Sequence, residues 1–184
     1  MPIVGRSERV SIIATRAEAP EEHKAFADRL VELRHGEIGS GPYGILIHSP
    51  DLACRVADAG EYIRFKSSLP KAITELATLA ATRGIDAAYP WTVHQPGAQS
   101  AGVSEQAVAA LRNGSSTDDL ASDEKLVIDY VRTLQREHRI PAEMFAALRE
   151  RFGVQGVVDL AATIGLYGLL GCVVNTFELV PTEV

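Results

Sequence analysis

Apolar residues recur at helical spacing along most of the chain. Phe26, Leu30 and Leu33 stand at positions i, i+4 and i+7, which is the one-face spacing of an amphipathic helix. The segment 73–81 repeats this period with isoleucine, leucine and alanine. No stretch shows the strict alternation of apolar and polar residues that is typical of a half-buried strand. The pattern therefore predicts an all-α fold.

Proline, glycine and capping residues divide this pattern into about eight helices. Helices begin at capping residues or proline and commonly end at glycine. On this basis helices are predicted for residues 20–36, 49–65, 70–83, 89–101, 104–113, 122–138 and 141–152, with a last one ending near Glu178 after a break at Gly153. Pro96 predicts a kink inside the fourth helix. Residues 36–44 and 114–119 are predicted to be loops.

The length and the net charge of the chain indicate how many domains it has and which partners it does not bind. The 184 residues are a length typical of one domain, so we expect a single domain over residues 1–184. The net charge of −6 argues against a nucleic-acid partner, because a nucleic-acid groove needs clustered positive charge. The N-terminus has no signal-peptide pattern, so we expect a cytoplasmic protein.

One uncharged segment, residues 160–177, is long enough in principle to span a membrane. Glycines and polar side chains interrupt it, however, and its composition fits a helix that packs closely against neighbours. We therefore expect a buried helix and no membrane partner.

The two cysteines exclude several kinds of site. Cys54 and Cys172 are far apart and neither belongs to a CxxC pair, which excludes a dithiol redox centre local in sequence. No Cys/His cluster has the spacing of a zinc site, so we expect no bound metal. Two cysteines are also too few for a disulfide scaffold.

Two residues are candidates for acid–base chemistry, His94 and Glu75. His94 is predicted to lie about one turn inside a helix, where the positive end of the helix dipole favours a neutral imidazole that can accept a proton. Glu75 lies in the apolar run 73–81; spacing alone favours an exposed position for it, and a buried, paired carboxylate is the alternative. Because one turn at Gly84 separates their helices, an antiparallel pair would bring the two side chains together.

The residues around this pair carry a family resemblance. Residues 69–104, LPKAITELATLAATRGIDAAYPWTVHQPGAQSAGVS, resemble the core of the carboxymuconolactone decarboxylase family, within the alkylhydroperoxidase D-like superfamily. The stretches GPYGILIHSPDL, GEYIRFKSSLP and VQGVVDLAATIGLYGLLGCVVNTFE resemble other helices of longer members, so that the resemblance covers about residues 36–180. It implies an alkylhydroperoxidase D-like helical fold and a homo-oligomer, either a trimer or a hexamer.

The chain departs from this pattern where the superfamily's peroxidases carry their thiols. Those peroxidases have a glutamate, a CxxC and a histidine in this core. Glu75 and His94 match the glutamate and the histidine, but Ala87 and Pro90 stand at the two cysteine positions. Turnover through a thiolate is therefore not expected at this site. The closest branch usually has a second glutamate, and here that position is also Pro90.

The namesake reaction removes a carboxylate from a γ-lactone in aromatic-compound catabolism. It needs an electron sink, which the lactone supplies, and a positioned proton donor, but no cofactor. The resemblance therefore implies a cofactor-free, decarboxylase-like lyase or isomerase acting on a small carboxylated or lactone-type molecule. His94 would shuttle the proton, and Glu75 would orient His94 or relay the proton.

Five residues are candidates for binding the substrate: Tyr89, Trp91, His48, Arg64 and Tyr167. The three aromatic residues either wall a pocket or pack in the core. Arg64 either neutralises a substrate carboxylate or faces solvent. His48 either lines the pocket or forms a structural hydrogen bond.

Two other functions stay open. Pro90, in place of the usual glutamate, fits a non-catalytic ligand-binding or assembly protein that has kept the fold. The other alternative is a thiol antioxidant, peroxiredoxin-like, that uses Cys54 or Cys172; apolar surroundings such as those of Cys172 make a thiol less reactive.

Overall fold

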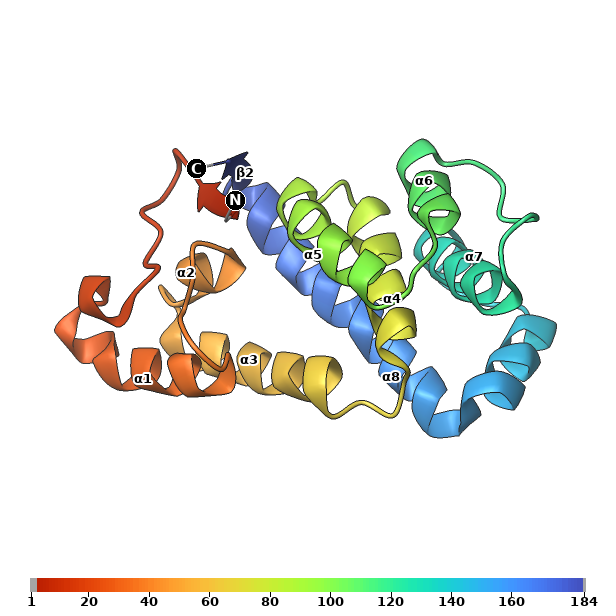
Figure 1. The fold of residues 1–184 in the computed structure, drawn as a ribbon. Helices are drawn as coiled ribbons and strands as arrows, with labels where there is room; N and C mark the ends of the chain where they lie inside the picture. Colours follow the sequence, from red (N-terminus) through yellow and green to blue (C-terminus); the bar gives the residue numbers. More distant parts are fainter. Residues whose placement is uncertain (1–2, 184) are drawn as a thin grey trace.

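The computed structural model describes residues 3–183, and this part of the chain is mostly helical (Figure 1). Its eight helices are α1 (Lys24–Leu33), α2 (Pro42–Leu46), α3 (Pro50–Phe65), α4 (Lys71–Arg83), α5 (Ala88–Ser100), α6 (Glu105–Asn113), α7 (Ser122–Glu137) and α8 (Ala142–Thr176). Two short 3-10 helices, Arg16–Glu18 and Glu21–His23, precede α1. The all-α prediction is confirmed.

Two local features differ from the sequence prediction, whereas α5 runs through Pro96 to Ser100 as predicted. Helix α2 begins at Pro42, inside the predicted glycine-rich loop 36–44, and extends to Leu46. Strands β1 (Ile3–Arg6) and β2 (Val180–Glu183) pair antiparallel, with Ile3 opposite Glu183. Four-residue strands are too short to show an alternating pattern, and their partners come from opposite ends of the chain, so local sequence does not reveal them.

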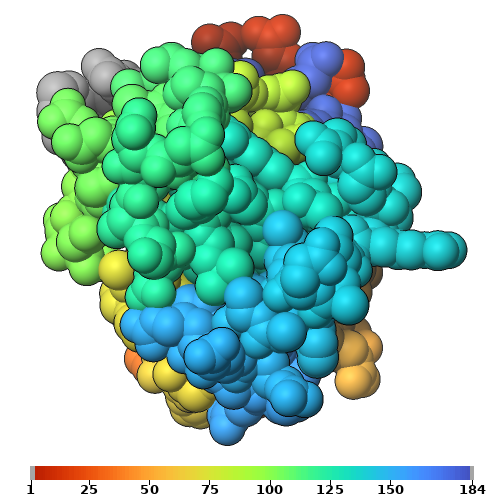
Figure 2. Space-filling model, turned by 90° about the vertical axis from the view of Figure 1, so that its right-hand side faces the viewer, coloured from red at the N-terminus to blue at the C-terminus, as the bar shows by residue number. Residues whose placement is uncertain are grey.

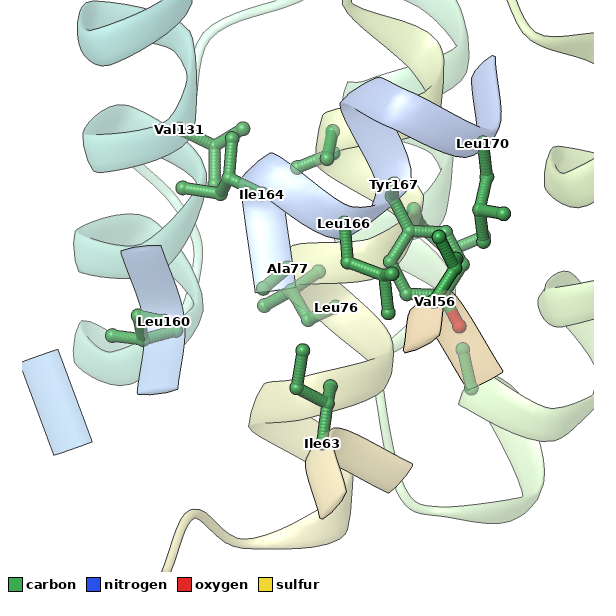
Figure 3. Close-up of a cluster of buried hydrophobic side chains, with 14 of the residues drawn as sticks. Val56, Ile63, Leu76, Ala77, Val131, Leu160, Ile164, Leu166, Tyr167 and Leu170 are labelled. Carbon is green, nitrogen blue, oxygen red and sulfur yellow. The ribbon is translucent and has the colours of Figure 1, made fainter. Parts of the chain in front are cut away.

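Helix α4 is the central element of the fold. It packs against α5, α7 and α8, and all its side chains from Ile73 to Thr82 are buried. Figure 3 shows side chains of α3, α4, α7 and α8, among them Ile63, Leu76, Val131 and Ile164, filling the space between these helices. Helices α6 and α7 and the first part of α8 make up most of the side face in Figure 2, which covers α4 on that side.

This enclosure corrects the expectation for Glu75. Spacing alone favoured an exposed carboxylate, but Glu75 is only 8% exposed. The spacing argument assumes that a helix keeps one face in water. Because α4 has neighbours on several sides, its polar positions are buried together with the apolar ones.

Helix α8 consists of two helical segments joined at Gly153. This glycine has φ 69° and ψ 173°, a conformation that is essentially restricted to glycine, and the predicted break is confirmed. Helix α8 is long and apolar enough to span a membrane by composition alone, but 56% of its most apolar window is buried. It contacts α2, α3, α4 and α7, so the structure uses it as a core helix.

Asp159 of α8 forms hydrogen bonds with the end of α3 and with the loop that connects α3 to α4. Its carboxylate accepts hydrogen bonds from the Ser67 hydroxyl at 2.8 Å, the Ser68 amide at 3.0 Å and hydroxyl at 3.1 Å, and the Tyr62 hydroxyl at 3.3 Å. Burial opposes ionisation of this carboxyl, but the donors outweigh it and hold its pKa below the ordinary 3.8. Asp159 therefore contributes stability as an anion.

Replacing Asp159 with asparagine is expected to lower the free energy of unfolding by about 2 kcal/mol, because buried donors lose a charged acceptor. Since the folded pKa is depressed, this contribution is present above the unfolded value of 3.8 and is lost as the pH falls through the folded value. Urea denaturation over the acid range measures both effects. The control Asp51→Asn removes a carboxylate from an exposed ion pair and should cost less than about 1 kcal/mol; an equal cost for the two variants would contradict the assigned role.

Candidate active site

A cavity of about 430 Å³ lies where α3, α4, α5 and α8 meet the segment that follows α1. This volume is typical of sites for small molecules, which measure about 300–1,000 Å³. Glu75 of α4, His94 of α5 and Tyr167 of α8 all line it. The cavity therefore collects polar side chains from three different helices.

The three side chains form a continuous chain of hydrogen bonds. His94 Nδ1 lies 2.9 Å from Glu75 Oε2, and His94 Nε2 lies 3.1 Å from the Tyr167 hydroxyl. An ionised carboxylate only accepts hydrogen bonds, so Nδ1 carries a proton. In the neutral imidazole, Nε2 then accepts a hydrogen bond from the Tyr167 hydroxyl. A carboxylate that fixes the tautomer and orientation of a histidine is a recurrent arrangement in acid–base catalysis.

Glu75 keeps its negative charge although it is buried. Burial alone would raise the pKa of this carboxyl, but the contact with His94 and the nearby Lys71 outweigh burial and hold the pKa below the ordinary 4.5. Lys71 Nζ lies 3.3 Å from Glu75 Oε1, so each carboxylate oxygen has its own partner. Glu75 is thus a fixed anion beside the imidazole.

Tyr167 stays a protonated phenol. Burial strongly raises its pKa, and Arg64 reduces this effect only in part. Its ring meets the His94 ring edge-on, with the centroids 5.1 Å apart. At neutral pH Tyr167 can therefore donate a hydrogen bond into the site but does not act as a base by itself.

The structure places the other predicted binding residues in three environments. Tyr89 and Arg64 line the cavity together with Tyr167. Trp91 lies outside it, in a separate hollow at the end of α4 beside Arg83 and Arg112. His48 is exposed, and its Nε2 lies 2.9 Å from the Ser11 carbonyl oxygen. Trp91 and His48 therefore do not line the cavity, because their side chains contact other parts of the chain.

The position of His94 in its helix also differs from the prediction. It lies six residues beyond the first helical residue, Ala88, whereas the effect of a helix terminus falls off within about the first turn. Glu75, rather than the helix terminus, fixes the tautomer and the orientation of the imidazole.

Sequence analysis missed two cations that line the cavity, Lys71 and Arg34. Lys71 precedes Glu75 by four residues, a spacing that signals a side-chain pair on one helix face. Arg34 follows α1 and reaches the cavity only through the way α1 packs on α3. No local pattern identifies a residue placed in this way.

The cysteines lie away from the cavity lining. Cys54 is buried, and its Sγ lies 3.6 Å from the Phe26 carbonyl oxygen; burial raises the pKa of its thiol, which disfavours the reactive thiolate. Cys172 is exposed on α8. Among residues 3–183, no group of three His, Cys, Asp or Glu side chains is arranged to hold a metal ion.

Two solved structures resemble the fold of this chain, although their sequences differ widely from it. No protein-family model and no curated protein sequence matches the chain. A solved structure from Ralstonia eutropha JMP134, an alkylhydroperoxidase AhpD core protein described as uncharacterized and peroxidase-related, is similar, with a TM-score of 0.73 and 17% identity over 100% of this chain and 94% of that chain. A variant of the debrominase Bmp8 in complex with 2,3,4-tribromopyrrole has a TM-score of 0.70 and 15% identity over 95% of this chain and 92% of that chain. The chain therefore has the alkylhydroperoxidase D-like fold.

Proposed function

We propose that this protein is an enzyme, a cofactor-free lyase or isomerase that transfers a proton at a carbon atom of a small carboxylated or lactone-type molecule. The observation that carries this proposal is the hydrogen-bonded chain from Glu75 through His94 to Tyr167, which lines one cavity. A general acid–base needs a fixed orientation and a partner that stabilises its charged form. Glu75 meets both needs for His94.

The three residues have separate tasks in this mechanism. When a carbon atom loses CO₂ or a proton, its electron pair moves into the adjacent carbonyl and an enolate forms. Once His94 Nε2 carries a proton it no longer accepts from Tyr167, and the single hydroxyl proton of this neutral buried tyrosine is then free to stabilise the developing oxygen charge. His94 delivers a proton to carbon or removes one, and Glu75 stabilises the imidazolium that exists between these steps.

The volume and the lining of the cavity also suit a small ligand. Tyr89, Pro90 and Leu170 give it apolar walls, while the polar chain occupies one side. A protein of the same fold has been solved with 2,3,4-tribromopyrrole, a small planar molecule. A lactone ring of comparable size suits such a site.

A panel of carboxylated lactones and their isomers, followed by NMR, tests the proposal. At least one compound should lose CO₂ or isomerise, and the double variant Cys54→Ser/Cys172→Ser should be as active as wild type. Absence of turnover over the whole panel would favour the non-catalytic alternative. Peroxide reduction that Cys54→Ser abolishes would favour the thiol antioxidant instead.

Tyr167→Phe is expected to lower kcat about tenfold, the effect of losing one hydrogen bond to a developing charge, with little change in KM. The phenyl ring keeps the packing against His94, so thermal stability should change little. Steady-state kinetics measure the effect, and Tyr130→Phe, which alters another buried tyrosine outside the cavity lining, is the control. Equal kcat values for wild type and Tyr167→Phe would exclude the hydroxyl from the reaction.

We further propose that the protein forms a homo-oligomer. Val154, Val158 and Leu169 of α8 are 63%, 60% and 39% exposed, and apolar side chains grouped on one helix support a protein contact. Light scattering should give the mass of a trimer or hexamer; a monomer at micromolar concentration would contradict this.

A further inference from the structure

Two arginines line the cavity, Arg34 and Arg64. Eight of the other twelve arginines pair with an acidic side chain, and the remaining four lie outside this cavity lining. Within residues 3–183, neither Arg34 nor Arg64 forms such an ion pair; each instead lies against an aromatic ring. Arg34 is held partly out of water, where a cation without a counter-ion is costly, and Arg64, although exposed, adds a second positive charge to the same cavity.

Arg34 is held in place by uncharged groups, which do not neutralise the positive charge of its guanidinium. Its Nε donates to the Glu37 carbonyl oxygen at 3.1 Å, and its guanidinium carbon lies 4.3 Å from the centre of the Tyr43 ring. Burial lowers the pKa of Arg34, and the positive charge of Arg64 lowers it further. Two like charges therefore line the same cavity.

Two of the three carboxylates that line the cavity, those of Glu75 and Glu61, have partners of their own. Glu75 binds His94 and Lys71, as described above. Glu61 pairs with Lys66 at 2.9 Å and has His35 at 3.8 Å. Glu37 supplies its backbone carbonyl to Arg34, and its carboxylate forms no ion pair with either arginine. An anion that enters the cavity would therefore meet two guanidinium groups that, within residues 3–183, form no ion pair.

We propose that Arg34 and Arg64 bind a carboxylate group that the substrate keeps through the reaction. The guanidinium fork matches a carboxylate in a bidentate manner. Placing a carboxylate there relieves the repulsion between the two arginines. The inference rests on the proposed function in one respect, since it takes the bound anion to belong to the substrate.

We call Arg34 and Arg64 together the arginine clamp. Its positive charge decides whether the bound carboxylate is the one that leaves as CO₂ or one that stays on the molecule. Loss of CO₂ requires a carboxylate to give up its negative charge to the rest of the molecule. Two arginines stabilise that charge in the ground state and so raise the barrier to its loss. The carboxylate bound by the two arginines therefore positions the substrate and does not react. A substrate that is isomerised needs only this carboxylate, whereas a substrate that is decarboxylated needs a second carboxylate elsewhere in the cavity.

Calorimetric titration of the full-length protein with benzoate and 2-furoate tests the clamp, with benzamide as the uncharged isostere of benzoate. At least one carboxylate should bind with a Kd of about 1 mM or tighter, and benzamide should bind about tenfold more weakly or not at all. Arg34→Gln and Arg64→Gln should each weaken carboxylate binding about tenfold or more, and Arg34→Lys should restore part of it. Arg139→Gln, which alters an exposed arginine outside the cavity lining, should bind like wild type.

Several results would overturn the clamp: no binding of either carboxylate, equal binding of benzoate and benzamide, or unchanged binding in both arginine variants. Inorganic phosphate that binds as tightly as the carboxylates would replace a carboxylate clamp with a general anion site. Arg64 is exposed, so Arg64→Gln keeps the test valid if Arg34→Gln fails to fold. His94→Ala should retain carboxylate binding, which separates a failure of the clamp from a failure of the proposed catalysis.

Discussion

His94→Ala is expected to lower kcat by about 10²–10⁴-fold, the range that a general acid–base contributes. Glu75 and Tyr167 each hold one nitrogen of this imidazole, so the variant removes both the proton carrier and the centre of the hydrogen-bonded chain. Carboxylate binding should persist, because Arg34 and Arg64 are untouched. The measurement is steady-state kinetics on the compound that the lactone panel identifies.

His48→Ala is the matched control for this variant. His48 is also a histidine near the predicted site, but it is exposed and outside the cavity lining, so its loss should leave kcat unchanged. An activity of His94→Ala within about threefold of wild type would remove His94 from the chemistry, since an acid–base residue contributes at least about 10²-fold.

Glu75→Gln is expected to lower kcat by about 10²-fold or more, within the range for acid–base catalysis. Glutamine keeps an oxygen that accepts from His94 Nδ1, so the hydrogen bond can persist while the charge is lost. The variant therefore isolates the stabilisation of the imidazolium from the orientation of the ring. It also leaves Lys71 without the acidic partner that now lies 3.3 Å away.

The pH dependence gives a second reading of Glu75. Because its pKa lies below the ordinary 4.5, the carboxylate stays ionised over the neutral range, and its contribution to activity is lost only as the pH falls through that lowered value. Glu143→Gln, which changes an exposed glutamate at the start of α8, is the control. Wild-type kcat in Glu75→Gln would show that the carboxylate charge has no part in the reaction.

Local signals in the sequence predict most helix boundaries of this fold. The Ser104 hydroxyl accepts from the Ala107 amide at 3.0 Å, as expected of a capping serine, and Gly114 ends α6 in the left-handed conformation. Gly153 breaks α8 where the pattern predicts. These features depend on a few neighbouring residues, so the chain itself specifies them.

The features that escaped prediction all depend on distant parts of the chain. Glu75 is buried because three helices surround α4, and Arg34 reaches the cavity because α1 packs on α3. Trp91 is three residues from His94 yet faces a different hollow. A helical pattern indicates that side chains share a face, but the neighbours of that face follow from tertiary packing.

Deuterium incorporation is the most direct test of the central claim, that the chain from Glu75 through His94 to Tyr167 transfers a proton at carbon. The substrate identified by the panel is converted in D₂O, and the product is examined by NMR. The account predicts deuterium at the carbon that is protonated, with an incorporation rate that falls in His94→Ala and Glu75→Gln in step with turnover. Product formed at the wild-type rate without carbon-bound deuterium, or equal incorporation in His94→Ala, would contradict it.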